Sequence, residues 1–395
     1  MLSELAPQSD AGDYVRPAPQ LGTGAMWPAR LPAVAGRYHV YVGNACPWCH
    51  RVMIALAMRG QLGVISSTRL ADDPARASRG GWCFDASDPD PLCAASDLRE
   101  VYNHCTAGGD YEGRVTAPLL VDLETAEIIS NESADIVRML NSLDIAEGAE
   151  ASGGPEVVVD LFPPNLAEEI DAANEWVYEL VNNGVYRAGF ATTQDAYERA
   201  ERDVHEGLAR CDSILERRRF LCGEVVTEAD VRLLPTIVRF DGVYASFFRC
   251  GRKLIRADYP HVARWMEEMR ALAGPGHFDL DAARTSYYTN LFPLNPGGIV
   301  PIGPKLAETP KKSAERDAFT WRARGPPGRG GARAAPVVMI AAVGEGQDGG
   351  DGEAETVEWN PMAGWDCEDE EECVLPYDDD DDSDDGGGAT DGDTQ

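Results

Sequence analysis

The sequence predicts an α/β domain followed by an all-α domain and a disordered acidic tail. Strand-like and helix-like patterns alternate over residues 37–145, and the pattern over residues 166–280 is helical throughout. Beyond residue 305 the chain has too few apolar side chains to offset the entropy lost when a backbone is ordered. With 395 residues, 44% of them hydrophobic, the chain is long enough for two domains with cores of their own.

Changes of composition divide the chain into five regions. Residues 1–36 are rich in Pro and Gly and are expected to form an extended N-terminal arm. Residues 146–165 have Pro and Gly at both ends and form a linker between the α/β domain and the helical domain. The helical domain covers residues 166–304 and closes with an aromatic, Pro-rich coda over 281–304. Residues 305–395 form the tail, which is basic first and then acidic.

The net charge of −32 is concentrated in the tail, because residues 351–395 contain 19 Asp or Glu and no Lys or Arg. The rest of the chain offers no sustained basic face, so we expect no nucleic acid as a partner. We also expect no membrane span, since no run of eighteen apolar residues occurs. The first residues resemble neither a signal peptide nor a transit peptide, which favours a cytoplasmic location, with a chloroplast or another organelle as the alternative.

The ten cysteines are too dilute for a disulfide scaffold. Only Cys46 and Cys49 have the C-x-x-C spacing, and neither a second such pair nor a His pair at ligand spacing is found. The sequence therefore predicts no structural zinc site and no metal cofactor.

Cys46 lies in a pattern that predicts an activated thiol. A β-rich run, Tyr38–Val42, is followed by a short break, by Cys46-Pro47, and by the helix-forming run Arg51–Arg59 that ends at Gly60. This order of strand, loop, Cys, Pro and helix is typical of a thioredoxin-like active site. The free N–H groups and the dipole of a helix start favour the thiolate, which is the form that attacks sulfur. We therefore predict that Cys46 is a nucleophile rather than an inert buried cysteine.

Cys49 follows one helical turn later and has two interpretations. It is either a resolving thiol, able to close a disulfide with Cys46, or a small half-buried residue on the inner face of the helix. The sequence favours neither. His50 and Arg51 are interpreted as groups on the helix surface rather than as catalytic ones.

A second group of residues predicts a binding groove. Glu132 and Ser133 stand at the start of a helix, where backbone N–H groups bind a carboxylate and the Glu side chain accepts from an ammonium group; a simple N-cap is the alternative. Ala117 precedes Pro118 within the strand-like run 115–122, and a cis bond there leaves the backbone of Ala117 free to pair with a peptide. With the thiol of Cys46, these sites describe a groove for one short peptide, and glutathione has that shape.

Eight sequence blocks then resemble one family. The chain is similar to the glutathionyl-hydroquinone reductases, the Xi class of glutathione transferases, which are omega-like enzymes. The resemblance runs from about residue 26 to 304. The blocks are, in order, NACPWCHR, GWCFD, EGRVTAPLL, SNESADIVRMLN, WVYELVNNGVYRAGFATTQ, TEADVRL, VRFDGVY and NPGGIVPIGP.

The resemblance implies a thioredoxin-like domain, an all-helical transferase domain and a homodimer, with glutathione as co-substrate and quinone detoxification as the role. It implies that Cys46 attacks the thioether sulfur of a glutathionyl-hydroquinone and that a second glutathione resolves the mixed disulfide. Trp82 and Arg114 fall in blocks that help to bind glutathione in the family. Tyr186 and Tyr287 match positions that line the quinone pocket, where a phenol either hydrogen-bonds a quinol oxygen or supplies a proton to the ring carbon; the alternative for each is a packing role.

Tyr178 and Tyr244 are weaker candidates for the quinone pocket. Thr227–Asp230 matches a capping box and is assigned to folding. Two positions depart from the family: Cys49 replaces the usual Ala, and Ala117 replaces the usual Val.

Two other functions compete with the leading one. The first is an omega-like or glutaredoxin-like thiol transferase that acts on protein mixed disulfides or dehydroascorbate, with Cys49 as a second thiol. The other is a non-catalytic module whose acidic tail recruits a basic partner, although the charge of the tail is also explained by solvation alone.

Overall fold

The computed structural model of the protein describes residues 6–18, 21, 31–73, 81–143, 145, 159–274, 278–291 and 294–303. The chain divides into two units, Met1–Ile340 and Ala341–Gln395, and the described residues all belong to the first. The predicted tail and most of the predicted linker lie outside the described residues, as do parts of the predicted arm. No helix in the described part of the chain is both long and apolar enough to cross a membrane.

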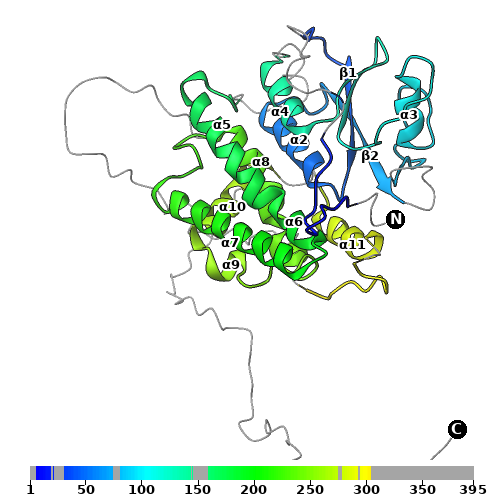
Figure 1. Cartoon of the computed structure of the whole chain (residues 1–395). Helices are drawn as coiled ribbons and strands as arrows, with labels where there is room; N and C mark the ends of the chain where they lie inside the picture. Colours follow the sequence, from blue (N-terminus) through cyan, green and yellow to red (C-terminus); the bar gives the residue numbers. More distant parts are fainter. Residues whose placement is uncertain are drawn as a thin grey trace, which may run out of the picture. The chain divides into compact units, whose positions relative to one another are not determined.

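Five strands form one mixed sheet in the order β3-β2-β1-β4-β5 (Figure 1). The central strand β1 is buried at all six residues, which explains its apolar and aromatic composition. It pairs with β2 in parallel and with β4 in antiparallel, so that Val40 lies between Ser67 and Leu120. The strands are β1 (Tyr38–Gly43), β2 (Ser66–Asp72), β3 (Trp82–Cys83), β4 (Leu119–Asp122) and β5 (Glu127–Ser130).

The strand-like run over 115–122 becomes a strand only at Leu119, where β4 begins. The proline at 118 has no N–H to donate to a neighbouring strand, so it precedes the first paired residue instead of lying within the strand. The predicted boundary was therefore wrong by four residues.

Helix α2 (Pro47–Met58) lies at the centre of the molecule. Cys46 is its N-cap, and Pro47 takes the first helical position, where the missing N–H has no cost. Ten of its twelve residues are buried, because α4 (Ser133–Ser142) covers one side and the helical domain the other. His50 and Arg51 are among them, so the expectation that they lie on the helix surface was wrong. The other helix of this domain, α3 (Leu98–His104), lies across the sheet from α2 (Figure 1).

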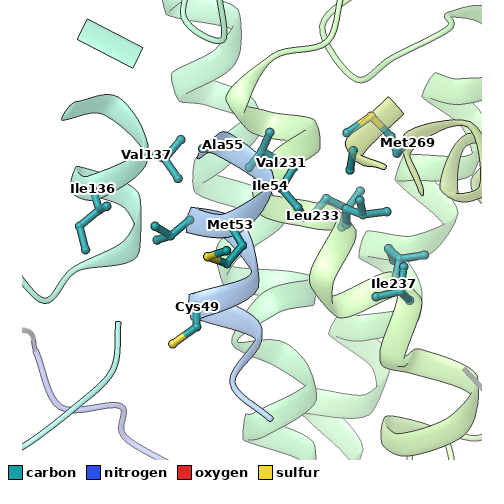
Figure 2. Packing of buried hydrophobic residues seen from close by; sticks show 14 of the residues in the cluster. Cys49, Met53, Ile54, Ala55, Ile136, Val137, Val231, Leu233, Ile237 and Met269 are labelled. Carbon is teal, nitrogen blue, oxygen red and sulfur yellow. The ribbon is translucent and has the colours of Figure 1, made fainter. Parts of the chain in front are cut away.

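The two domains share one apolar core around α2 (Figure 2). Since truncating such a buried side chain to Ala costs about 2–5 kcal/mol, this core holds α2, and Cys46 at its start, firmly against the helical domain. The side chains that meet there are Met53 and Ile54 of α2, Ile136 and Val137 of α4, and Val231, Leu233, Ile237 and Met269 of the helical domain.

The helical domain carries one element that the sequence analysis missed. The predicted coda over 281–304 begins with a helix, α11, which ends at residue 290. Asp279 caps it by accepting from the N–H of Ala282 at 2.9 Å, and two of its aromatic residues, Tyr287 and Tyr288, are buried. The elements of the domain are η3 (Pro164–Leu166), α5 (Ala167–Trp176), the π-helical turn η4 (Val177–Asn182), α6 (Gly184–Phe190), α7 (Gln194–Arg217), α8 (Glu228–Arg239), the π-helical turn η5 (Phe240–Tyr244), α9 (Ile255–Asp258), α10 (Pro260–Ala273) and α11 (Leu280–Asn290).

Helix α8 starts at the predicted capping box. The carboxylate of Asp230 accepts from the N–H and the hydroxyl of Thr227 at 3.0 and 3.1 Å. It also accepts from the N–H of Leu221 and the indole of Trp265, both at 3.0 Å. Asp230 is completely buried, so these four donors replace the water it has lost.

The described part of the N-terminal arm lies against the helical domain. Gln8 donates to the carbonyl of Phe190 at 3.0 Å, and the carbonyl of Gly12 accepts from the N–H of Thr192 at 3.0 Å. Gly12 has a φ of +83°, and a Cβ there would lie 2.6 Å from Thr193, so this close approach needs a glycine. These contacts bring residues 14–18 to the mouth of a cleft at the junction of the domains.

Candidate active site

The sulfur of Cys46 lies where helix α2 begins, 3.5 Å from the carbonyl oxygen of Ala117. The side chain is half-buried, and the Ala117–Pro118 peptide bond beside it is cis. The predicted nucleophile and the residue predicted to contact a peptide backbone are therefore neighbours, although 71 positions separate them.

The surroundings of Cys46 favour its thiolate. Burial raises its pKa, but hydrogen bonds from the thiol and N–H of Cys49 and from the N–H of Trp48 act in the opposite direction. The positive charge of Arg239 lowers it further, and together these interactions hold the pKa of Cys46 below its ordinary value. A thiolate at the start of a helix is the form that attacks sulfur, so Cys46 is equipped for thiol chemistry.

Cys49 is a protonated partner of Cys46. Its exposed fraction is 0%, and its sulfur accepts from the N–H of Gly43 at 3.3 Å. Burial, and then the neighbouring Cys46, raise the pKa of Cys49 well above its ordinary value. A thiol that keeps its proton donates to the thiolate beside it, so Cys49 stabilises the reactive form of Cys46.

A cleft of about 180 Å³ opens between the start of α4, the loop before β4 and the N-terminal arm. Four of the residues predicted to bind glutathione line it: Arg114, Ala117, Glu132 and Ser133. The remaining lining residues are Tyr14, Arg16, Pro17, Ala18, Trp48, Thr116, Pro118, Asn131 and Tyr178.

The start of α4 combines both interpretations that the sequence allowed. Glu132 is the N-cap, since its carboxylate accepts from the N–H of Ala134 at 3.0 Å and from the hydroxyl of Ser133 at 3.3 Å. The same two side chains also line the cleft, so the N-cap is compatible with the predicted binding role. Arg51 donates to the hydroxyl of Ser133 at 3.4 Å and so connects α2 with this end of the cleft.

Trp82, the fifth residue predicted to bind glutathione, does not line the cleft. Its indole packs on β1, where a Cβ at Gly43 would lie 2.2 Å from the ring. Gly43 is thus required for the close approach of this aromatic ring to the strand. The predicted contact between Trp82 and glutathione stays a prediction.

Trp48 joins the cleft to the helical domain and was not singled out from the sequence. Its indole lies between two guanidinium groups, those of Arg16 at 4.2 Å and Arg51 at 4.4 Å from the ring centroid. Both distances fall within the range of cation–π attraction. Trp48 also stacks against Tyr186 with ring centroids 6.2 Å apart. Tyr186, like Cys46, is not among the residues that line the cleft, so Trp48 connects the cleft with a neighbouring group of aromatic residues.

Three tyrosines form a hydrogen-bonded cluster at that end. The hydroxyl of Tyr287 lies 2.7 Å from that of Tyr186 and 3.1 Å from that of Tyr244. They come from α11, α6 and η5, and burial raises the pKa of each phenol. The charge of Cys46 is a further cause that raises the pKa of Tyr186 and of Tyr244. We call these three residues the tyrosine cluster.

The cluster includes one residue that the sequence analysis rated lower. Tyr244 was a weaker candidate than Tyr186 and Tyr287, yet it shares the same hydroxyl network. Tyr178, the other weaker candidate, stands at the cleft, 40% exposed and 6.2 Å from Trp48. Among the described residues, no group of three or more His, Cys, Asp or Glu side chains is arranged to hold a metal ion.

Comparison with known proteins agrees with this geometry. A model described as the N-terminal domain of glutathione S-transferase matches residues 45–143, and one described as the C-terminal domain matches residues 194–268. The glutathionyl-hydroquinone reductase YqjG of Escherichia coli is 41% identical over 273 residues, which cover 68% of this chain and 79% of that protein. The glutathionyl-hydroquinone reductase PcpF of Sphingobium chlorophenolicum is 40% identical over 302 residues, 75% of this chain and 91% of that protein.

Solved structures give the same result. The Xi glutathione transferase of Phanerochaete chrysosporium superposes with a TM-score of 0.65 at 37% identity, covering 73% of this chain and 97% of that one. A thioredoxin-like domain followed by an all-helical domain is the architecture of the glutathione transferases. The chain belongs to the Xi class of this family, the class of the glutathionyl-hydroquinone reductases. The predicted fold class and family are thereby confirmed.

Proposed function

We propose that the protein reduces glutathionyl-hydroquinones to hydroquinones at the expense of glutathione. The observation that carries the proposal is the hydrogen-bonded tyrosine cluster, whose Tyr186 stacks on Trp48, two positions after the activated Cys46. A thiolate alone serves any thiol transferase, whereas cleavage of a carbon–sulfur bond also requires a proton for the ring carbon. The two relatives named glutathionyl-hydroquinone reductase support the same substrate class.

In the first step, the Cys46 thiolate attacks the thioether sulfur of the conjugate. A disulfide bond forms between Cys46 and glutathione, the bond from sulfur to the ring carbon breaks, and its electron pair passes to that carbon. A phenol of the tyrosine cluster supplies the proton, and free hydroquinone leaves. The ring carbon has been reduced by two electrons, and two sulfur atoms have been oxidised.

In the second step, another glutathione attacks the glutathione sulfur of the mixed disulfide. Its thiol proton returns to the phenolate, oxidised glutathione leaves, and the Cys46 thiolate is restored. The lining of the cleft supports the binding of the glutathione part, with Glu132 and Ser133 at the amino-acid head and Ala117 at the peptide backbone. Arg114 and Arg16 provide positive charge for the carboxylates.

The test is an assay of the purified full chain with a glutathionyl-hydroquinone and glutathione. We expect free hydroquinone and oxidised glutathione in equal amounts from the wild type and neither from Cys46→Ser. Without free glutathione, mass spectrometry is expected to find one glutathione on Cys46 after a single turnover. The absence of hydroquinone from the wild type, or full activity of Cys46→Ser, would refute the proposal.

A second candidate function rests on Cys49, which donates a hydrogen bond to Cys46. In a glutaredoxin-like thiol transferase, Cys49 would attack the mixed disulfide and release glutathione as a Cys46–Cys49 disulfide forms. Wild type exposed to the conjugate alone would then show an internal disulfide, whereas Cys49→Ala would keep the glutathione adduct. A stable adduct in both proteins would exclude this role.

We also propose the homodimer that the family resemblance implies, and a basic partner for the acidic tail. Sedimentation of the full chain tests the first, and a mass of one chain would contradict it. A chain truncated after residue 304 tests the second. If binding to an immobilised polylysine peptide is the same with and without the tail, the tail is not a docking segment.

A further inference from the structure

Arg239 is a buried cation at the last position of α8. Its exposed fraction is 0%, and among the ion pairs of the described residues none includes it. Its guanidinium donates to the carbonyl of Pro235 at 3.0 Å and to that of Asn44 at 3.5 Å, and its Nε is buried without a partner. Burying a charge without a charged partner is costly, so a structural role alone does not account for this residue.

Arg239 contacts residues that precede and follow Cys46 in the chain. Asn44 precedes the nucleophile by two positions, and His50, whose Nδ1 is 3.0 Å from the guanidinium, follows it by four. Because a guanidinium only donates, Nδ1 of His50 is the acceptor and the imidazole is neutral. The ring of His50 stacks on Phe278 with centroids 4.6 Å apart, which fixes its position. The helical domain thus places one positive charge in contact with the residues that flank Cys46 in the chain.

The same charge acts on the tyrosine cluster. Arg239 is among the causes that lower the pKa of Tyr244 and of Tyr287, against the larger effect of burial. It acts in the same direction on Cys46. The titratable groups on which its charge acts are Cys46 and Cys49 of the α2 segment, Tyr244 of η5 and Tyr287 of α11, and the one it contacts is His50.

We propose that Arg239 is the counter-charge of the reaction, which stabilises the Cys46 thiolate before the attack and a phenolate of the tyrosine cluster after it. This inference rests on the proposed function. When the disulfide to glutathione forms, the negative charge leaves sulfur with the electron pair that reaches the ring carbon. That carbon takes a proton from a phenol, and the negative charge remains on the phenol oxygen. One cation and one anion are therefore present in the buried site before and after the step.

The charge returns to Cys46 in the second step. The phenolate takes the proton of the second glutathione, the new thiolate attacks the mixed disulfide, and Cys46 leaves as a thiolate. Arg239 is thus a positioning residue that acts on charge at two sites without touching the substrate. Arg239 has no fixed carboxylate partner in the described part of the chain because its counter-ion is the negative charge that moves between the Cys46 sulfur and a phenol oxygen during turnover.

The first test measures the alkylation of Cys46 by iodoacetamide as a function of pH, with the modified residue identified by mass spectrometry. In Arg239→Gln we expect the midpoint to rise by about one pH unit, the lower end of the effect of a nearby opposite charge, because Arg239 follows the hydrogen bonds among the causes that lower the pKa of Cys46. Arg239→Met serves if the Gln variant does not fold. Arg239→Lys keeps the charge and is expected to stay close to the wild type. A folded neutral variant with an unchanged midpoint, or a Lys variant that shifts as far as the neutral one, would overturn the proposal.

Arg264 on α10 provides a matched control. Its guanidinium is also held by backbone carbonyl groups, those of Leu215 at 2.7 Å and Arg218 at 3.4 Å, and its Nε is also buried without a partner. Arg264→Gln therefore removes a similarly bound arginine away from the thiol. We expect its alkylation midpoint to equal that of the wild type, and an equal shift in both variants would mean that the effect is a general loss of structure.

The second test addresses the phenolate. If Arg239 stabilises it, Arg239→Gln is expected to reduce hydroquinone release less in a Tyr287→Phe background than in the wild type. Additive losses would limit the role of Arg239 to the thiolate and refute the second half of the proposal. The alkylation test needs no quinone substrate. A protein that releases no hydroquinone but shows the shift would therefore contradict the proposed function and still support Arg239 as the counter-charge of Cys46.

Discussion

Tyr287→Phe is the substitution that best separates quinone reduction from simple thiol transfer. The Tyr287 hydroxyl bonds to both other members of the tyrosine cluster, at 2.7 Å to Tyr186 and 3.1 Å to Tyr244. Removing it deletes one oxygen and leaves the ring and its packing in place. If the cluster delivers the proton to the ring carbon, hydroquinone release is expected to fall by a factor of about 10²–10⁴, the usual contribution of a general acid.

The loss of stability in Tyr287→Phe is expected to be small relative to the loss of activity. Two phenols lose one partner each, and a buried polar group left without a partner costs about 1–3 kcal/mol. In a protein of this size, each kcal/mol lowers the melting temperature by roughly 2–4 °C. The variant is thus expected to be folded at 25 °C, and its loss of activity is not explained by unfolding.

Tyr288→Phe is the matched control on the same helix. Tyr288 is also buried, and its hydroxyl bonds to Ser246 and to the carbonyl of Gly242, outside the tyrosine cluster. We expect a similar loss of stability in this variant with hydroquinone release close to that of the wild type.

The assay compares two activities of each variant at one glutathione concentration. One is the release of hydroquinone from a glutathionyl-hydroquinone, and the other is the reduction of a small glutathione mixed disulfide, which needs no proton at carbon. Tyr287→Phe is expected to lose the first and keep the second. Equal loss of both activities, or hydroquinone release within about threefold of the wild type, is not compatible with a general acid in the cluster.

Three further substitutions test other parts of the site and the fold. Cys49→Ala removes a donor to Cys46, so the pKa of Cys46 rises. Because the thiolate is lost as the pH falls through that pKa, activity is expected to decline from a higher pH than in the wild type. An unchanged pH profile would show that the thiol of Cys49 does not act on Cys46. Arg16→Gln removes a cation over Trp48, an interaction worth about 0.5–1 kcal/mol. It is expected to raise the KM for glutathione roughly two- to fivefold with little change in kcat. A change in kcat alone would contradict a binding role for Arg16. Asp230→Ala leaves several buried donors without an acceptor. It is expected to lower the free energy of unfolding, measured in urea, by more than about 3 kcal/mol. A loss below about 1 kcal/mol would mean that water replaces the carboxylate.

Much of the site was predictable because its signals are local in the chain. The order of strand, Cys, Pro and helix depends on neighbouring residues, and the structure places Cys46 at the start of α2 as that order requires. The box at Thr227 likewise depends on a residue three positions away. Interactions of this range are formed by the backbone geometry of one turn and need no knowledge of the rest of the molecule.

Other features were missed or misjudged because they depend on what packs against a helix from a distance. His50 and Arg51 look like surface groups in a helix read alone, but α8 covers that side of α2 and buries both. The predicted coda was not assigned a helix, although its residues Tyr287 and Tyr288 lie on the buried face of α11. In both cases the neighbouring element, and not the local pattern, decides the burial of the side chain.

By itself, the sequence determined the fold class and the family, and it predicted Cys46 as the nucleophile together with the binding residues beside it. Only the tertiary structure decided that Arg16 of the arm and Arg239 of the helical domain reach the same small region as Cys46, and that Tyr244 completes the hydroxyl network of Tyr287. A thiolate acquires its reactivity from charges and donors within a few ångströms. Which residues supply them is settled by the packing of helices that lie far apart in the chain.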